Sequence, residues 1–267
     1  MANEEQRGGR TDRDTRRPRG RSDAPGDPSL GLSVSLELGQ PFAFDAPFAA
    51  RLRRRQLNPK EAFTLHDVEG AWFRATIRTL EPAGGTALPY ERLARSPEPT
   101  VEITLACAVL ARQRMIFVMQ KATELGVARV IPLFSAFSVP RAGLDHEKAH
   151  AWPGQVLRGA RQCRRSSLPE VLPPTPLDAF LASAVVAGAD LTVYLDDRAE
   201  APPRPVARPA RLVLIAGPEG GFSDAERGAL RNRAHPWLLG GRVLRAETAV
   251  LAGLTVAHVN WGDFRCL

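Results

Sequence analysis

Hydrophobic and polar residues alternate in the first third of the chain, in short runs separated by turn residues. The runs are LSVSLEL (residues 32–38), EAFTLHD (61–67) and AWFRATIRTL (71–80). Alternation with a period of two is typical of strands that bury one face. Glu69–Gly70 and Gly84–Gly85 supply turn residues for hairpins. The pattern predicts a small antiparallel β-rich domain over residues 30–99.

A different pattern begins near Thr100, where apolar runs alternate with amphipathic segments. The runs that predict strands are VEITLACAVL (101–110), LTVYLDD (191–197), LVLIAG (212–217) and HPWLLG (235–240). Residues 115–134 predict a helix capped at Gly126 and then a further strand, and residues 145–167 predict a long helix interrupted or restarted at Pro153. The alternation predicts an α/β domain over residues 100–267, with a mostly parallel sheet covered on both faces.

Two glycine turns follow strands near the end of this domain. Gly217–Gly221 comes first, and Ser223 with Glu226 then matches a capping box that opens a helix. Gly240–Gly241 precedes the strongly apolar final helix. Neither turn has a phosphate-loop or dinucleotide-binding spacing. Ligands of parallel sheets bind beyond the carboxyl ends of the strands. The turns therefore predict two sides of one pocket. The first turn is equally consistent with a tight strand-to-helix turn that binds no ligand.

The charge of the chain indicates an anionic partner. Its formal net charge is +7, and all but three of its 36 basic residues are arginine. Arginine suits phosphate and base recognition, although an arginine-rich proteome gives the same composition. Arg51, Arg53, Arg54 and Arg55 crowd a loop or short helix and are candidate phosphate contacts. A charge run of this kind is more often a solvated surface, so both interpretations stay open.

Composition and residue spacing argue against a membrane-spanning, disulfide-bonded or metal-binding protein. Residues 1–29 carry charges, glycine and proline with almost no aliphatic residue, which predicts a disordered tail. Three cysteines without metal-like spacing favour a reduced, cytoplasmic setting. No run approaches the ~20 apolar residues of a membrane span. His146 and His150 lack a third clear ligand, so we expect no metal.

Three motifs carry a resemblance to a known family. They are MQKATELGVARVIPLFS (119–135), GPEGGFSDAE (217–226) and LLGGRVLRAETA (238–249). In this order they closely resemble the bacterial small-subunit (16S) ribosomal RNA uracil-N3 methyltransferases of the SPOUT superfamily. The resemblance implies an α/β domain with a C-terminal trefoil knot, preceded by a PUA-like β-barrel that binds RNA. It also implies S-adenosylmethionine as methyl donor, a homodimer, and ribosomal RNA or the assembled small subunit as substrate.

The resemblance assigns roles to individual residues. The implied cofactor-binding residues are Leu195, Asp196, Ile215, Gly217, Pro218, Glu219, Gly220, Gly221, Leu239, Gly240, Val243, Leu244 and Thr248. Glycine and leucine predominate because backbone groups can read the adenine edge while aliphatic side chains enclose the ring. Arg245 and Glu247 would lie nearest the transferred methyl group. Arg245 can stabilise a uracil anion by pairing with a carbonyl oxygen, whereas Glu247 equally fits a helix N-terminal charge.

A second group of arginines extends the predicted RNA surface. Arg158, Arg161 and Arg165 recur at three- and four-residue spacing, which places them on one helical face. In a dimer, the arginines of residues 51–55 in one subunit could lie beside the pocket of the other, and the two groups would then form one basic track.

Departures from the family pattern concern the substrate side. Ala111–Met115 replaces the usual lysine and acidic pair, while Arg161 and Arg164 stand where an acidic residue and a glycine are common. Two alternatives to a uracil-N3 methyltransferase therefore stay open. One is a SPOUT enzyme that acts on another RNA base or a ribose, and the other is a catalytically weak RNA-binding homologue. The intact cofactor motifs argue against the latter.

Overall fold

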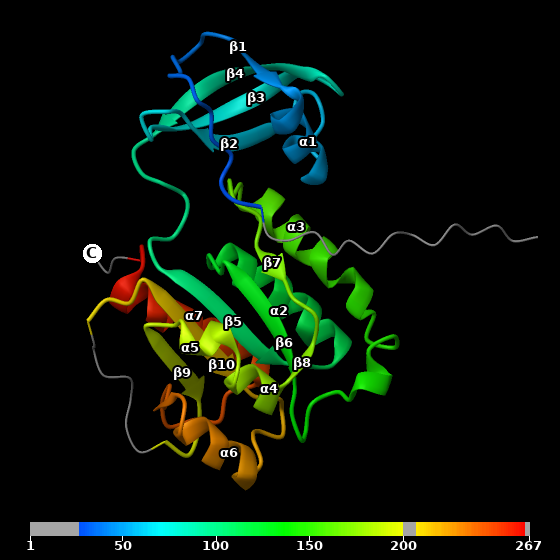
Figure 1. Ribbon diagram of the computed structural model, residues 1–267, viewed down its shortest axis with the longest axis vertical. Helices are drawn as coiled ribbons and strands as arrows, with labels where there is room; N and C mark the ends of the chain where they lie inside the picture. The colour runs from blue at the N-terminus through cyan, green and yellow to red at the C-terminus, as the bar shows by residue number, and fades with distance from the viewer. Residues whose placement is uncertain (1–26, 200–206, 265–267) are drawn as a thin grey trace, which may run out of the picture.

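The computed structural model describes residues 27–199 and 207–264, which form two sheets with separate hydrophobic cores (Figure 1). Residues 1–26 of the predicted tail lie outside the described residues. Its last residues do not follow the prediction, because Asp27 exchanges two backbone hydrogen bonds with Leu168, at 2.9 and 2.8 Å. None of the helices in the described part of the chain is long and apolar enough to cross a bilayer.

The smaller sheet is antiparallel, in the order β1-β4-β3-β2. Its strands are β1 (Phe42–Asp45), β2 (Ala62–His66), β3 (Trp72–Glu81) and β4 (Gly84–Leu93). The run at residues 32–38 was predicted as a strand and is not one. Leu36 is buried but Val34 and Leu38 are half exposed, so the alternating residues do not share one buried face. The segment instead crosses the end of β2, where the Leu36 amide donates to Asp67 Oδ2 at 3.3 Å.

The arginine cluster lies on a helix, α1 (Ala46–Arg54), which covers the small sheet. Asp45 caps it by accepting a hydrogen bond from the Phe48 amide at 3.0 Å, and Pro47 lies in the first turn. The basic residues fall in the last turn, where they favour the negative end of the helix dipole. Buried Phe48 and Leu52 join the core of the small sheet.

The larger sheet is parallel throughout, as the strand and helix alternation predicts. Its order is β11-β9-β10-β5-β6-β7, with β8 also paired to β6. The strands are β5 (Glu102–Ala108), β6 (Arg129–Phe134), β7 (Glu170–Val171), β8 (Thr175–Pro176), β9 (Leu191–Leu195), β10 (Arg211–Ala216) and β11 (His235–Trp237). Their carboxyl ends meet at one edge, which is where ligands of such sheets bind.

Helices cover both faces of this sheet, as expected. The helices α2 (Arg112–Glu124), α3 (Trp152–Gln162) and α7 (Ala246–Trp261) form one core with it, while α4 (Leu177–Leu181), α5 (Ala184–Ala187) and α6 (Asp224–Arg231) form the other. The helix predicted over residues 145–167, interrupted or restarted at Pro153, does start there: α3 begins at Trp152 with Pro153 in its first turn, and it ends at Gln162. Two short 3-10 helices, η1 (Arg141–Gly143) and η2 (Ala149–Ala151), precede it.

Asp27 and Arg55 join the small sheet to the larger domain. Asp27 is 5% exposed and accepts hydrogen bonds from Arg51 Nε, at 3.0 Å, and from Arg55 Nη1. The buried Arg55 side chain also donates to the carbonyl oxygen of Ser166 at 2.8 Å. Burial lowers the pKa of Arg55, and the Asp27 carboxylate opposes that shift. The junction therefore depends on a buried ion pair.

Candidate functional site

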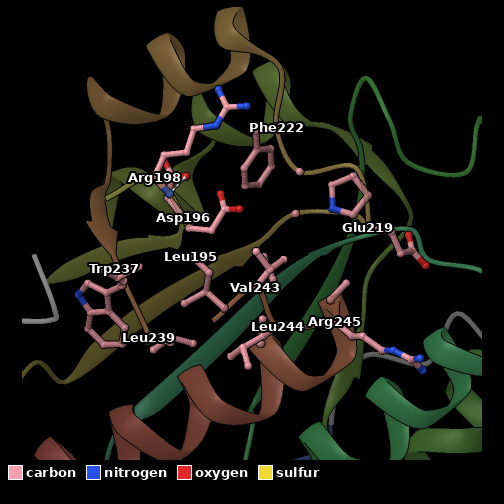
Figure 2. A pocket seen from close by; sticks show the side chains of 18 of the residues that line it. Leu195, Asp196, Arg198, Glu219, Phe222, Trp237, Leu239, Val243, Leu244 and Arg245 are labelled. Atoms are coloured by element: carbon pink, nitrogen blue, oxygen red, sulfur yellow. Dashed lines mark hydrogen bonds between the residues drawn. The ribbon is translucent and has the colours of Figure 1, made fainter. Parts of the chain in front are cut away.

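A pocket of about 450 Å³ lies beyond the carboxyl ends of β9, β10 and β11. Three segments build it: residues 195–198 from the end of β9, residues 216–222 from the end of β10, and residues 237–246 from the end of β11 to the start of α7. Figure 2 shows the labelled side chains of all three segments around the pocket. Both glycine turns line this one pocket, as the sequence predicts.

The first glycine turn is tight and requires glycine at Gly221. The Gly221 amide donates to the Pro218 carbonyl at 2.9 Å, and Gly221 has a φ of +71°. A left-handed φ is strained for a residue with a side chain, and most of all for a β-branched one. The predicted capping box follows: Ser223 and Glu226 cap each other at the start of α6. The turn therefore presents backbone to the pocket in a fixed conformation.

One end of the pocket is apolar. Leu195, Trp237, Leu239, Val243 and Leu244 line it from three different segments, and Figure 2 shows them together on the side away from Glu219. Val243 is 84% exposed, so its side chain has no structural partner that covers it. An apolar, concave wall of this kind suits a flat aromatic ring.

Asp196 lines the pocket but is also part of a buried ion pair. Its carboxylate pairs with Arg227 of α6, and both side chains are almost fully buried. Arg227 Nε donates to the Phe222 carbonyl at 3.1 Å, and the Asp196 amide donates to the Trp237 carbonyl at 3.1 Å. The pair thus holds all three pocket segments together. Arg227 was missed from the sequence, because a lone arginine on a helix looks like a solvated residue.

The other end of the pocket is charged. Arg114, in the first turn of α2, donates a hydrogen bond to Glu219 of the glycine turn, and its Nε lies 3.8 Å from Glu247 Oε2. The Glu219 carboxylate raises the pKa of Arg114. Glu247 Oε2 is buried and accepts no hydrogen bond within the described residues. Arg245 lines the pocket beside this cluster, and Figure 2 shows it on the same side as Glu219.

The structure places most of the sequence-predicted cofactor residues on the pocket wall. Those that line it are Leu195, Asp196, Gly217, Pro218, Glu219, Gly220, Gly221, Leu239, Gly240, Val243 and Leu244, with the predicted catalytic Arg245. Ile215 and Thr248 do not line it. Ile215 is fully buried among α4 and α6, on the other face of the sheet, and Thr248 is exposed on α7. Glu247 contacts the charged end only through Arg114.

Several pocket residues were missed by sequence reasoning. They are Arg114, Asp197, Arg198, Ala216, Phe222, Arg227, Trp237, Leu238, Arg242, Ala246 and Ala249. Arg114 was noticed only as part of a departure from the family pattern at Ala111–Met115. Its position in the first turn of a helix that follows β5 was a usable signal, since β5 ends at the same edge as β10.

The structure divides the predicted RNA-binding arginines into two groups. Arg53, Arg54, Arg158 and Arg161 are exposed, with Arg161 paired to Glu61 at 2.7 Å. The prediction is wrong for Arg55 and Arg165, whose side chains are buried in ion pairs with Asp27 and Glu98. Arg51 is partly buried and donates to Asp27, Pro28 and Ser29. Burial and these partners leave the three side chains unavailable to phosphate.

No group of His, Cys, Asp and Glu side chains within the described residues has the arrangement of a metal site. His146 is exposed and its Nδ1 lies 2.9 Å from Glu147. The chemistry of the pocket therefore has to be argued from its apolar wall, its backbone turns and its charged end.

Several known proteins with similar sequences share one name. Residues 96–258, more than half of the chain, match the family of RNA methyltransferase domains. The ribosomal RNA small subunit methyltransferase E of Synechocystis is 30% identical over 77% of this chain and 67% of its own length. The protein of the same name from Buchnera aphidicola of Schizaphis graminum is 29% identical over 88% of this chain and 97% of its own length.

Solved structures agree with the sequence comparison. Ribosomal RNA small subunit methyltransferase E from Neisseria gonorrhoeae, bound to S-adenosyl methionine, has a TM-score of 0.63 and 26% identity, covering 90% of this chain and 100% of that one. A methyltransferase from Legionella pneumophila, in complex with the same cofactor, has a TM-score of 0.62 and 29% identity, covering 88% and 98%. The chain therefore belongs to the RNA methyltransferase family that includes the ribosomal RNA small subunit methyltransferase E proteins, and the cofactor expected from its sequence, S-adenosylmethionine, is the one bound in both of these structures.

Proposed function

We propose that this protein uses S-adenosylmethionine to methylate N3 of a uridine in 16S ribosomal RNA. The observation that carries the proposal is the pocket at the carboxyl edge of the parallel sheet, which has an apolar end and a charged end. The names of its relatives support the 16S RNA as the substrate. The choice of N3 of uridine rests on the resemblance of the three sequence motifs.

The pocket fits the cofactor in size and chemistry. Its volume of about 450 Å³ lies within the range of small-molecule sites, roughly 300–1,000 Å³. Leu239 and Val243 provide apolar contact for an adenine ring, and the turn at Gly221 brings backbone close without a side chain in the way. With adenine at the apolar end, the methionine part extends toward Glu219 and Arg245. That orientation brings the reacting methyl group to the charged end.

The charged end suits methylation of a ring nitrogen that carries a proton. S-adenosylmethionine supplies an electrophilic methyl group, so the protein has to remove or neutralise the N3 proton and hold the base in line. Arg245 has no ion-pair partner within the described residues, and its guanidinium can pair with a uracil carbonyl oxygen as negative charge develops there. Glu247 Oε2 accepts no hydrogen bond within the described residues and lies 3.8 Å from Arg114 Nε, and this carboxylate is the candidate acceptor for the N3 proton.

Nucleoside mass spectrometry tests this function. In a strain that lacks the gene, 16S RNA should lose one N3-methyluridine, and the purified protein should restore it with labelled S-adenosylmethionine. Methylation of a different base, or of a ribose, would replace the N3 assignment with the alternative SPOUT activity. Binding of 16S RNA without any methyl transfer would favour the catalytically weak homologue.

The cofactor assignment predicts a strong effect at Gly221. Gly221→Val forces a β-branched residue to a φ of +71°, so the turn has to distort. A strained residue of this kind costs about 1–3 kcal/mol, and we expect S-adenosylmethionine affinity to fall about 10- to 100-fold. Calorimetric titration measures it. Gly228→Ala on α6 is the control, because an added Cβ there meets no atom within 4 Å. Equal affinity in Gly221→Val and wild type would remove this turn from the cofactor site.

The remaining parts of the proposal concern assembly and RNA binding. The family resemblance supports a trefoil knot in the C-terminal part of residues 100–267, a PUA-like role for the sheet of residues 30–99, and a cytoplasmic homodimer. The exposed Arg53 and Arg54 lie on α1, whose C-cap Arg55 bonds to Ser166 of the larger domain, and the exposed Arg158 lies on α3, which ends four residues before Ser166. We include these three in the RNA surface.

The salt dependence of RNA binding tests that surface. Each phosphate contact contributes about 0.7–0.9 to the slope of log affinity against log salt. Replacing Arg53, Arg54 and Arg158 together by glutamine should lower the slope by roughly two and weaken RNA binding at low salt, while S-adenosylmethionine affinity stays unchanged. The control carries the same replacement at Arg208, Arg211 and Arg233, which are exposed elsewhere. Parallel lines of equal height for the first variant and the control would refute the assignment.

A further inference from the structure

An exposed aromatic ring lies against the glycine turn of the pocket. Phe137 is 57% exposed, and a Cβ added to Gly220 would lie 3.0 Å from the Phe137 Cβ. Single exposed apolar side chains are common on protein surfaces and need no explanation. Phe137 differs in two respects, its rigid support and its position.

The support is a tight turn over Ser135–Ser138. The Ser138 amide donates to the Ser135 carbonyl at 3.2 Å, and the Ser135 amide donates to Ser138 Oγ at 2.9 Å. At the tip, the Ala136 amide donates to Glu226 Oε1 at 2.7 Å. Glu226 also belongs to the capping box that follows the glycine turn. These bonds fix the backbone on both sides of Phe137 and link it to the pocket, so the ring projects from a turn that is itself held in place.

The position is the carboxyl end of β6, two strands from β10 in the sheet order β10-β5-β6. Val139 donates to the Val109 carbonyl at 3.0 Å, which places the turn of Phe137 beside the segment that leads from β5 into α2. That segment carries Arg114, which pairs with Glu219 next to Gly220. Phe137 thus lies next to Gly220, and Arg114 is bound to Glu219, so both lie beside the glycine turn.

Arg114 itself is placed at some electrostatic cost. It lies in the first turn of α2, where no acidic residue is present and the helix dipole disfavours positive charge. The carboxylates of Glu219 and Glu247 offset that cost. The edge of the sheet beside the pocket therefore combines an aromatic face with a paired, partly exposed cation.

We propose that Phe137 is the stacking surface for an unpaired nucleobase of the RNA substrate at the methyl-transfer site. This inference rests on the proposed function. A base inside a duplex cannot bring its N3 atom to the methyl group, so it has to be unpaired and turned out of its stack. Unpaired RNA bases are held by stacking on aromatic side chains, with their edges left for hydrogen bonds. Stacking on Phe137 would leave the uracil edge free for Arg245 and Glu247.

Steady-state methylation by three variants tests the proposal, with 16S RNA that lacks the modification as substrate. Phe137→Leu keeps an apolar side chain but removes the flat ring, whereas Phe137→Tyr keeps the ring. Phe264→Leu is the control, because Phe264 is a partly exposed aromatic residue that packs on His258 near the end of α7. Loss of one base stack should raise KM for RNA about tenfold in Phe137→Leu. The value of kcat at saturating RNA and the affinity for S-adenosylmethionine should not change.

Near-normal KM in Phe137→Tyr, with the defect confined to Phe137→Leu, would support a stacking role. The proposal is overturned if Phe137→Leu behaves as wild type, if Phe137→Tyr is as defective as Phe137→Leu, or if the loss lies in S-adenosylmethionine affinity or in dimer formation. Fluorescence anisotropy of a single-stranded oligouridine separates the two levels of inference. If wild type binds the oligouridine more tightly than Phe137→Leu does, but transfers no methyl group to 16S RNA, only the proposed function is refuted.

Discussion

Replacing Arg245 by alanine should lower kcat for RNA methylation about 10²- to 10³-fold and leave S-adenosylmethionine affinity within a few-fold of wild type. The size of the effect is that of removing one donor that stabilises a developing oxyanion. Arg245 lines the charged end of the pocket and has no ion-pair partner within the described residues. Its replacement by alanine therefore breaks no buried ion pair. A group that acts only as charge develops changes kcat and kcat/KM equally.

Two further variants sharpen this test. Arg245→Lys keeps a positive charge but loses the planar pair of donors, so an intermediate kcat is expected. Arg233→Ala removes an exposed arginine near the end of α6 and should behave as wild type. Single-turnover methyl transfer at saturating cofactor and RNA is the measurement. If Arg245→Ala turns over at the wild-type rate, Arg245 has a structural role at the start of α7 and the uracil anion must be stabilised by another group.

The elements that depend on local sequence could be predicted. Strands of the parallel sheet read as short apolar runs, and the turn at Gly217–Gly221 with its capping box had a local signature that the structure confirms. The run at residues 32–38 had a strand-like signature too, yet its alternation follows a segment that only crosses the end of β2. Alternating polarity is compatible with a strand, but a strand forms only where a neighbouring strand is available to pair with it.

Contacts between distant segments could not be predicted from patterns. Arg55 and Arg165 looked like phosphate ligands because their partners, Asp27 and Glu98, are 28 and 67 residues away in the sequence. Arg114 and Phe137 lie beside the glycine turn only because β5, β6 and β10 are neighbours in the sheet. The resemblance to a family identified the pocket loops, and it marked Ala111–Met115 as a departure without showing that Arg114 lies at the pocket.

The largest effect on stability is expected at Asp27. Asp27→Ala leaves the Arg55 side chain, which is 5% exposed, without its carboxylate partner. Breaking a buried ion pair from one side typically costs 3–5 kcal/mol, because the remaining charge is buried and uncompensated. We expect the free energy of unfolding to fall by about that amount. Chemical denaturation, followed by a signal from each of the two sheets, measures it.

A second replacement separates loss of the pair from loss of packing. In Asp27→Ala with Arg55→Leu no charge stays buried, so much of the lost stability should return. Glu91→Ala is the matched control, because it breaks the partly exposed Arg74–Glu91 pair on the small sheet, and surface pairs contribute about 1 kcal/mol or less. The pocket lies at the far edge of the larger sheet, so Asp27→Ala should keep its S-adenosylmethionine affinity. KM for RNA should rise, because Asp27 no longer ties α1 to the segment around Leu168 of the larger domain and the RNA surface includes residues of both parts. Equal losses in Asp27→Ala and Glu91→Ala would show that the junction does not depend on this pair.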